Sequence, residues 1–364
     1  MPTSVTYDFA ARQRRARQEF DRHRADALLV THLPNIRYLC GFTGSAGALL
    51  LAQRRCIFLT DGRYREQARG EVSSASVVIS RGALIDAAAQ QLQKLRVRSV
   101  AIESDHMTVG LRDRLARQLG PGVRLRAVSG LVEQLRMIKD AAELQAIRNA
   151  VQLGCELFEP MLSLIRPGVA ETDISAELEH AAHRAGAEGM SFETIVASGT
   201  RSALPHGRAS AQAVPRNGFV VLDFGVILAG YCSDMTRTVH VGKAPARARQ
   251  MYETLREAQQ AARESVRPGV TAGEVDRAAR SLLRRAGYGR FFSHSTGHGV
   301  GLEIHEAPRV ARGQPDVLAP GMVITIEPGI YIAGQGGVRI EDMVAITDSG
   351  HELLTCTRRE LITL

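Results

Sequence analysis

A four-residue segment, RPGV, occurs twice in the second part of the chain, at Arg166–Val169 and Arg267–Val270. Each copy leads through an amphipathic helical stretch to the tripeptide RAG, at Arg184–Gly186 and Arg285–Gly287. The offset between the copies is the same at both ends, so the unit recurs without insertion. Such a repeat indicates duplicated structural units. Two halves packed about a pseudo-twofold axis would place a site at their junction.

The first part of the chain has a different pattern. Helical and strand-like stretches alternate there, which is typical of an α/β layer structure. Near Met137 this alternation stops, and Asp140 with Glu143 three residues later predicts a capped start for a long helix. We therefore expect an α/β domain over residues 1–135 and a second domain over residues 136–364. The elements expected in the first domain are helices at 8–24, 84–95 and 111–119 and strands at 27–31, 48–51, 56–59, 77–80 and 99–103.

Composition excludes several classes of protein. With 45% hydrophobic and 23% charged residues among 364, the chain is long and apolar enough for a packed core. No apolar run approaches the roughly 18 residues of a spanning helix, and no secretory signal is visible, so we expect a cytoplasmic protein with no membrane partner. Five scattered cysteines predict neither disulfides nor a thiolate zinc site. The formal charge of +8 comes with only 5% aromatic residues, which argues against a nucleic-acid partner.

Two carboxylates are predicted on one hairpin. Residues 219–226 and 231–241 have the composition of strands, with a short turn between them. A turn centred on Leu228 and Ala229 would place Asp223 directly opposite Asp234, and the apolar neighbours suggest that both are buried. Two buried like charges require either protonation or a cation, so this pair alone leaves a metal site and a solvated hairpin face open.

A second hairpin near the C-terminus carries two more carboxylates. Residues 323–327 and 338–346 are predicted to be strands joined by a glycine-rich turn. Glu327 and Glu341 lie at comparable depth on either side of that turn. His294, His298 and His305 lie in one glycine-rich segment, and His206 lies in a predicted loop. One histidine with four carboxylates is an oxygen-rich set that balances two divalent cations, manganese, iron(II) or cobalt rather than a structural zinc. Such a pair of cations activates water, so the set predicts metal-assisted hydrolysis.

These residues resemble the pita-bread metallopeptidases, the family of methionine aminopeptidase, aminopeptidase P, prolidase and creatinase. The matching strings are VLDFG, GYCSDMTRT, STGHGVG, ITIEPGIY and GVRIED, within residues 140–360. The resemblance implies an α+β pita-bread domain with a pseudo-twofold internal repeat, and an α/β creatinase/prolidase-type domain before it. It also implies a dinuclear site of divalent ions, manganese first and cobalt, iron(II) or zinc as alternatives, held by Asp223, Asp234, His298, Glu327 and Glu341.

The string GHGVGLEIHEAP and the N-terminal NIRYLCGFTGSAG resemble the proline-specific branch. By this resemblance His206 and His305 hold the substrate and stabilise its tetrahedral intermediate, and Glu327 is also the proton shuttle. His294 and Arg339 would contact the proline side. The branch acts on peptides with N-terminal Xaa-Pro, and a homodimer is its usual state.

Three readings of the function follow. The first is an Xaa-Pro aminopeptidase, which releases the residue before proline from peptides. The second is an Xaa-Pro dipeptidase, or prolidase, restricted to dipeptides; Arg339 could pair with a dipeptide carboxylate or merely orient Glu341. The third is a non-catalytic pita-bread scaffold, which the complete ligand set disfavours, as it disfavours metal-independent creatinase chemistry.

Overall fold

The computed structural model describes residues 7–364, which form two compact units that divide between Arg136 and Met137. We call them the N-terminal unit and the C-terminal unit. Helix α7 (Leu131–Met137) ends at this division. Within the described residues, no helix is both long enough and apolar enough to span a lipid bilayer.

The N-terminal unit is built on a six-stranded mixed sheet with the order β4-β3-β2-β1-β5-β6. The central strand β1 is antiparallel to β2 and parallel to β5. Leu29 and Leu50 of the sheet share one core with Leu92 and Leu115 of two helices, α5 and α6. The strands are β1 (Ala27–Val30), β2 (Ala48–Ala52), β3 (Cys56–Asp61), β4 (Ser76–Ser80), β5 (Ser99–Glu103) and β6 (Arg124–Val128), and the helices are α1 (Phe9–Gln18), α2 (Phe20–His23), α3 (Leu33–Cys40), α4 (Arg65–Glu71), α5 (Leu84–Leu95) and α6 (Val109–Leu119).

The α/β class predicted from the sequence is confirmed. The structure also contains helices and a strand that the hydrophobic pattern did not predict. The helix expected over residues 8–24 is two helices, α1 and α2, and the second of these ends at Arg24 in a left-handed conformation. Helices α3 and α4 and strand β6 were not predicted. All three are short, and in β6 only Val128 is buried, so the hydrophobic periodicity of that strand is weak.

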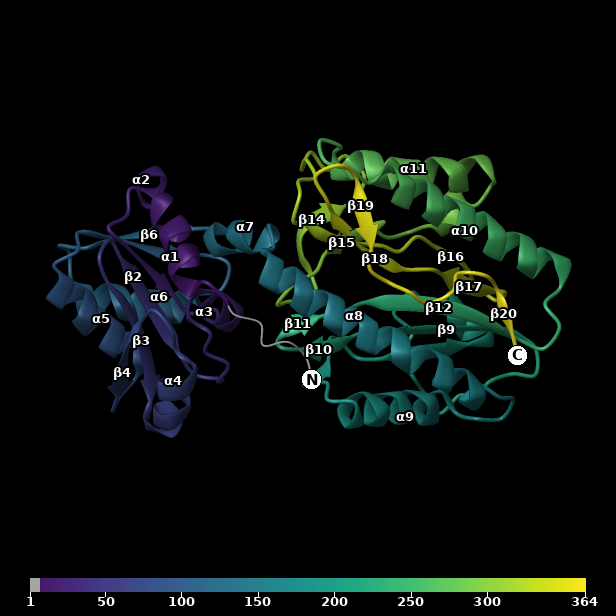
Figure 1. The fold of residues 1–364 in the computed structure, drawn as a ribbon, viewed down its shortest axis with the longest axis horizontal. Helices are drawn as coiled ribbons and strands as arrows, with labels where there is room; N and C mark the ends of the chain where they lie inside the picture. Colours follow the sequence, from purple (N-terminus) through teal and green to yellow (C-terminus); the bar gives the residue numbers. More distant parts are fainter. Residues whose placement is uncertain (1–6) are drawn as a thin grey trace. The chain divides into compact units, whose positions relative to one another are not determined.

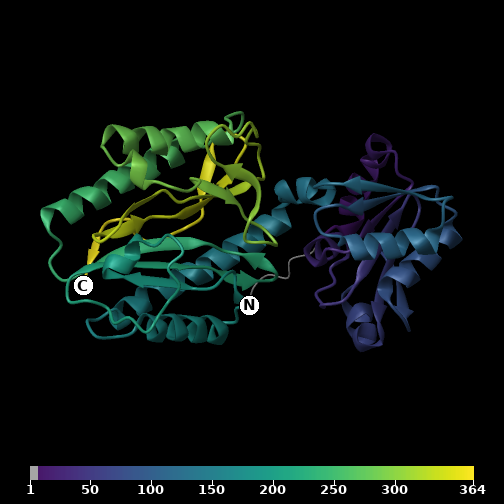
Figure 2. The ribbon, with the colours of Figure 1, turned by 180° about the vertical axis from the view of Figure 1, so that it is seen from behind.

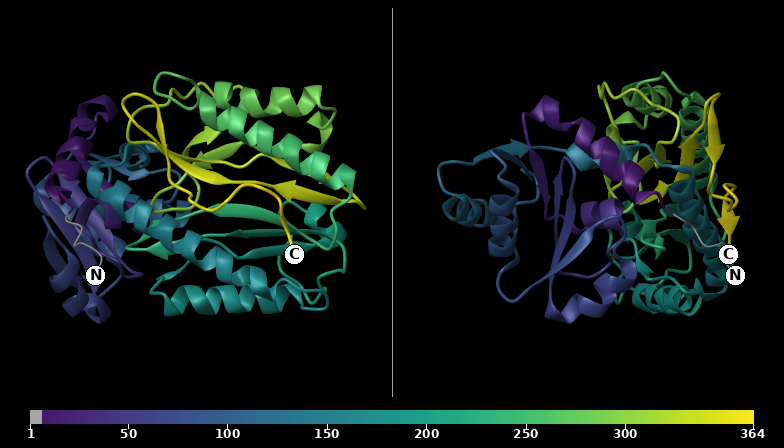
Figure 3. Two further views of the ribbon diagram at one scale, coloured as in Figure 1. Left: turned by 45° about the vertical axis from the view of Figure 1, so that its right-hand side comes forward. Right: turned by 60° about the vertical axis from the view of Figure 1, so that its left-hand side comes forward.

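The C-terminal unit consists of two halves with the same order of helices. Its helices are α8 (Ala141–Met161) and α9 (Glu171–Arg184) in the first half, and α10 (Ala246–Ser265) and α11 (Ala272–Arg285) in the second. Figures 1 and 2 place α9 and α11 at opposite edges of this unit, with the strands between them, and in the left view of Figure 3 α8 and α10 cross in front of the strands.

The sequence repeat coincides with a repeat of backbone geometry. Gly168 and Gly269 have φ of 92° and 85°, and the glycines that follow the two helices, Gly186 and Gly287, have φ of 96° and 84°. An isolated bridge precedes each helix, at Ala170 and at Thr271. The internal repeat predicted from RPGV and RAG is therefore present in the fold. Helix α8 also begins with the predicted capping box of Asp140 and Glu143.

The strands of the C-terminal unit form two larger sheets and two smaller ones. Their orders are β20-β12-β9-β8 and β14-β13-β15-β18-β19, with β11-β10-β7 and β16-β17 beside them. Ile324 and Val344 of the five-stranded sheet share a core with Leu255 and Leu283 of α10 and α11. The strands are β7 (Gly189–Met190), β8 (Ile195–Ser198), β9 (Gly218–Phe224), β10 (Val226–Leu228), β11 (Tyr231–Cys232), β12 (Met235–Val241), β13 (Gly297–Gly299), β14 (Glu306–Val310), β15 (Val323–Ile326), β16 (Gly329–Ile332), β17 (Gly336–Arg339), β18 (Asp342–Ile346), β19 (His351–Leu353) and β20 (Ile362–Thr363).

Candidate metal centre

The first pair of carboxylates lies on the hairpin formed by β9 and β12. Asp223 is in β9 and pairs with Thr236, whereas Asp234 lies in the gap between β11 and β12. The predicted pairing of Asp223 with Asp234 is therefore wrong. The turn is centred one residue later than expected, on Ala229 and Gly230, which both have positive φ, and this shifts the register. Both carboxylates are nevertheless buried in the same cavity.

The second pair lies on the hairpin formed by β15–β16 and β17–β18. Strands β15 and β18 pair in the same register as β16 and β17, and the ladder is interrupted between these two segments. Glu327 and Glu341 stand opposite each other in this interruption, at the comparable depth that the sequence predicted. Glu341 is 2% exposed, and the Glu327 side chain is 16% exposed.

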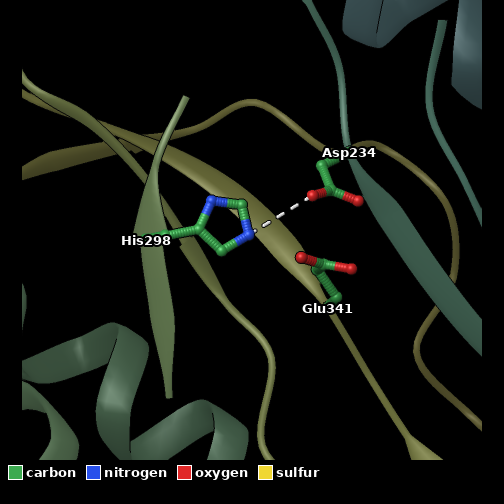
Figure 4. Close-up of side chains that lie close together, drawn as sticks. All are labelled: Asp234, His298 and Glu341. Carbon is green, nitrogen blue, oxygen red and sulfur yellow. Dashed lines mark ion pairs between the residues drawn. The ribbon is translucent and has the colours of Figure 1, made fainter. Parts of the chain in front are cut away.

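His298 joins the two hairpins from β13. Its Nδ1 lies 3.0 Å from the Gly299 carbonyl oxygen, which leaves the lone pair of Nε2 free. Nε2 lies 3.5 Å from Asp234 Oδ2 and 3.6 Å from Glu327 Oε1. Figure 4 shows the ring pointing between Asp234 and Glu341, and one ligand atom from each of these three residues lies within 4.8 Å of the others.

The cluster brings four carboxylates together, and Arg339 donates to one of them, Asp223. Burial, and then the charges of neighbouring carboxylates, raise the pKa values of Asp234 and Glu327 well above their usual range. The pKa of Glu341 rises to about 8 for the same two reasons. Burial lowers the pKa of His298 to about 4, so the ring is neutral at pH 7. Neutral imidazole and carboxylates are the forms that bind cations.

Two buried oxygen atoms also lack partners. Asp223 Oδ1 and Asp234 Oδ1 accept no hydrogen bond from the described residues. Buried polar atoms without partners are costly, and a cation between the carboxylates would satisfy both. The donor set is four carboxylates and one imidazole, with no thiolate, which is chemistry suited to hard or borderline divalent ions. The residues present therefore fit divalent metal ions.

Arg339 is the cation closest to this set and holds both hairpins in place. One guanidinium nitrogen, Nη2, donates to Asp223, and Nε donates to Thr236 Oγ1 at 3.1 Å. Thr236 in turn donates to Glu341 Oε2 at 2.7 Å. Arg339 thus orients Asp223 by a direct hydrogen bond, and it orients Glu341 indirectly, through Thr236. Its Nη1 donates to the Pro205 carbonyl oxygen and the Tyr331 hydroxyl, so its guanidinium is largely committed within the protein.

The remaining predicted residues line the same cavity, which has a volume of about 650 Å³. His206 and His305 lie at its exposed side, and the His305 ring meets the His298 ring edge-on with centroids 4.4 Å apart. His294 Nε2 lies 2.9 Å from the Tyr331 hydroxyl, and its Nδ1 lies 3.9 Å from Glu327 Oε2. All nine residues singled out from the sequence therefore meet around one cavity of the C-terminal unit.

Comparison with known proteins agrees with this geometry. Residues 145–348 match the metallopeptidase family M24, and residues 12–138 match the creatinase/prolidase N-terminal domain. The chain belongs to metallopeptidase family M24. It is thus a hydrolase with the pita-bread fold, preceded by a creatinase-type domain, as the sequence resemblance implied.

Three relatives of this M24 protein cover nearly all of it. The structure of an Xaa-Pro dipeptidase from Bacillus anthracis is 42% identical, with a TM-score of 0.95, and the match covers 98% of this chain and 100% of that one. An X-Pro aminopeptidase from Thermotoga maritima is 35% identical with a TM-score of 0.89, covering 96% and 100%. An Xaa-Pro dipeptidase from Pyrococcus horikoshii is 38% identical over 344 residues, 94% of this chain and 96% of its own.

Tyr331 and Arg309 belong to the M24 site, although the sequence analysis assigned neither a role. Tyr331 is buried beside His294 and Arg339, and burial raises its pKa to about 12. A Cβ on Gly329 would lie 2.3 Å from the Tyr331 hydroxyl oxygen, and a Cβ on Gly337, the cross-strand partner of Tyr331, would lie 2.8 Å from Tyr331 Cδ1. The glycine two residues before Tyr331 was the signal that the sequence offered. Arg309 lines the cavity from β14, where it pairs with His298. Its short strand was not predicted, so nothing in the sequence linked it to the site.

Proposed function

We propose that this M24 enzyme hydrolyses the Xaa-Pro peptide bond and that Xaa-Pro dipeptides are its preferred substrates. The observation that carries the proposal is the meeting of all five ligand residues in one cavity that Arg309 also lines. Our choice of the dipeptidase over the aminopeptidase is supported by relatives from Bacillus anthracis and Pyrococcus horikoshii that are named Xaa-Pro dipeptidases. The aminopeptidase remains the second candidate, favoured by the Thermotoga maritima enzyme.

Arg309 supports the choice of dipeptides. Its side chain makes no hydrogen bond or ion pair with the described residues, whereas Arg339 is committed to Asp223, Thr236, Tyr331 and Pro205. A free guanidinium beside a cavity of about 650 Å³ is suited to the terminal carboxylate of a short substrate. A longer peptide presents no carboxylate at that position.

Asp223, Asp234, His298, Glu327 and Glu341 would hold two divalent cations. When bound, these ions supply Lewis acidity toward the scissile carbonyl and lower the pKa of the attacking water. Manganese is our choice because the ligand set is rich in oxygen, with cobalt, iron(II) and zinc as alternatives. Metal analysis of the purified protein tests this choice.

The protein's own groups would move the proton. The Glu327 side chain is the more exposed of the two glutamates, and its carboxylate lies between the rings of His298 and His294. It is therefore placed to accept a proton from water and to pass it to the departing proline nitrogen. That transfer is needed because the proline nitrogen leaves as a neutral secondary amine only once it has gained a proton.

The histidines on the cavity wall would hold the substrate. We assign His206 and His305 to the scissile carbonyl, because both lie at the exposed side where a peptide enters. His294, tethered by Tyr331, would contact the proline ring together with the aliphatic part of Arg339. We also propose that the enzyme is a cytoplasmic homodimer.

The experiment compares Ala-Pro, Ala-Pro-amide and Ala-Pro-Ala with the manganese-loaded enzyme. We expect Ala-Pro to have the highest kcat/KM. We expect Arg309→Gln to lower kcat/KM for Ala-Pro about tenfold through KM, the effect of one charge-assisted hydrogen bond, and to leave the amide unchanged. Faster turnover of Ala-Pro-Ala would establish the aminopeptidase instead. If none of the three substrates is hydrolysed, the non-catalytic scaffold is the hypothesis that remains.

A further inference from the structure

A second cavity, of about 1030 Å³, lies against α11 in the C-terminal unit, and none of its lining residues lines the metal-site cavity. Its walls are one face of α11, the turn Gly287–Arg290 and the loop 312–315. Loop and helix are closely packed, since a Cβ on Gly273 would lie 2.8 Å from the Gln314 carbonyl oxygen. We call this space the α11 cavity.

Five arginines and one acidic residue are among the residues that line the α11 cavity. The acid, Asp276, is 1% exposed and already satisfied: Arg280 donates to it at 2.8 and 2.9 Å, and Thr296 donates at 2.8 Å. Arg280 also donates to the carbonyl oxygens of Phe292 and His294. Asp276 and Arg280 therefore neutralise each other, and Arg280 also holds the segment that carries His294.

The other four arginines have no such partner. Arg277, Arg284, Arg290 and Arg312 are exposed, and none makes a hydrogen bond or an ion pair with the described residues; Arg290 stacks on Phe291. The other acid on α11, Glu274, is bound by Thr271, and hydrogen bonds from Thr271, with a smaller effect of the Arg277 charge, lower its pKa. Four unneutralised positive charges thus border one cavity.

This arrangement selects for anions. Like charges around one cavity repel each other, so an anion that enters relieves that repulsion. Guanidinium groups match phosphate oxygens with two parallel hydrogen bonds each. A single phosphate has too few oxygens to engage four guanidinium groups in this way. No aromatic ring lines the cavity, so a base or another planar group has nothing to stack on.

We propose that the α11 cavity binds a small molecule carrying two or more phosphate groups. The volume is at the upper end of the range for small-molecule sites, and helix, turn and loop enclose it on three sides. The site is separate from the metal centre, and the proposal does not depend on the peptidase activity.

The test is calorimetric titration of the full-length, manganese-loaded protein at constant ionic strength. The probes are fructose 1,6-bisphosphate and inositol hexakisphosphate, with fructose 6-phosphate as the single-phosphate comparison and tetraglutamate as the carboxylate comparison. We expect one molecule of a multiply phosphorylated probe to bind, at least tenfold more tightly than fructose 6-phosphate or tetraglutamate.

The decisive variant is the double substitution Arg284→Gln and Arg312→Gln. Its matched control is Arg166→Gln with Arg247→Gln, which removes the same charge from exposed positions away from the cavity. We expect the affinity to fall at least tenfold in the cavity variant and less than twofold in the control. Melting temperatures check folding, and the single variants Arg277→Gln and Arg312→Gln on different elements provide the same comparison if the double variant does not fold.

Several results would overturn the proposal. One is that neither fructose 1,6-bisphosphate nor inositol hexakisphosphate binds. Another is an equal loss of affinity in both double variants, because this indicates nonspecific charge attraction. Binding that neither variant changes would place the probe outside the α11 cavity. Preference for tetraglutamate would indicate an acidic peptide. A dimer that dissociates only in the cavity variant on sedimentation would indicate that a second copy of the chain covers the cavity.

Discussion

Asp234 is central to the proposed metal centre, because its carboxylate lies close to both His298 and Glu341. We expect Asp234→Asn to lower kcat/KM for Ala-Pro at least about a hundredfold, since a neutral amide neither bridges cations nor matches their charge. Metal content should fall in parallel. Asp316→Asn, an exposed acid outside the cavity, is the control. Unchanged turnover in Asp234→Asn would contradict the proposed centre.

The acidic cluster also makes the stability of the metal-free protein depend on pH. Burial and the charge of Asp223 raise the pKa of Glu341 from 4.5 to about 8 in the folded chain. The folded state therefore holds a proton that the unfolded state releases, so this contribution to stability is present below pH 4.5 and is lost as pH rises toward 8. We expect the melting temperature of chelated protein to fall between pH 6 and 8.

Two controls separate this effect from general pH dependence. Added manganese should remove most of the fall, because cations replace the protons in the cluster. Chelated Glu341→Gln should also show a shallower fall, because it lacks the titrating group. A rise in stability over the same range in the chelated wild type would show that the cluster does not retain protons.

Tyr331 is a positioning residue, since its hydroxyl contacts His294 Nε2 and Arg339 Nη1 at 2.9 and 2.8 Å. We expect Tyr331→Phe to lower kcat/KM roughly tenfold, the effect of one lost hydrogen bond to a charged group, while metal content stays at the wild-type level. Tyr288→Phe is the matched control, because no hydrogen bond of its hydroxyl is present among the described residues. Equal effects of the two substitutions would remove the role we assign to Tyr331.

At the scale of elements, two interrupted hairpins determine where the carboxylates lie. In the first hairpin the gap between β9 and β10 is Gly225, and a Cβ there would lie 1.8 Å from the Ser233 carbonyl oxygen. Only glycine allows the chain beside Asp234 to approach so closely. In the second hairpin the gap carries Glu327 and Glu341 themselves.

We therefore expect Gly225→Ala to destabilise the C-terminal unit by about 3 kcal/mol, as overpacking does in a closely packed interior. In a unit of this size that corresponds to a fall in melting temperature of roughly 6–10 °C. Gly189→Ala is the control, because a Cβ there meets nothing within 4 Å. Equal melting temperatures of the two variants would show that the hairpin tolerates the added methyl group.

At the scale of the whole molecule, every proposed metal ligand belongs to the C-terminal unit. Calorimetric melting of the full chain should therefore show one transition that a chelator lowers and one that it leaves unchanged. Manganese at 100 times its Kd stabilises the folded state by about 2.7 kcal/mol, so we expect a shift of roughly 5–10 °C. An equal shift of both transitions would show that the two units unfold together.

The amino-acid sequence by itself determined the kinds of ligand and the repeat. Local patterns carry this information, because a repeat, a capping box and strings such as STGHGVG are read without knowing what lies nearby in space. The α/β class of the first part and the start of α8 were predictable for the same reason, since hydrophobic period and capping are local properties.

Tertiary structure alone decided the register of the first hairpin, the hydrogen-bond partners of Arg339 and the neighbours of Tyr331. A turn shifted by one residue changed the partner of Asp223 from Asp234 to Thr236, which sequence composition does not resolve. Arg339 joins Asp223 and Thr236, more than 100 positions away along the chain, and such contacts depend on how sheets pack. The four arginines of the α11 cavity that have no hydrogen bond or ion pair among the described residues come together for the same reason, since the helix, the turn and the loop that carry them meet only in the folded chain.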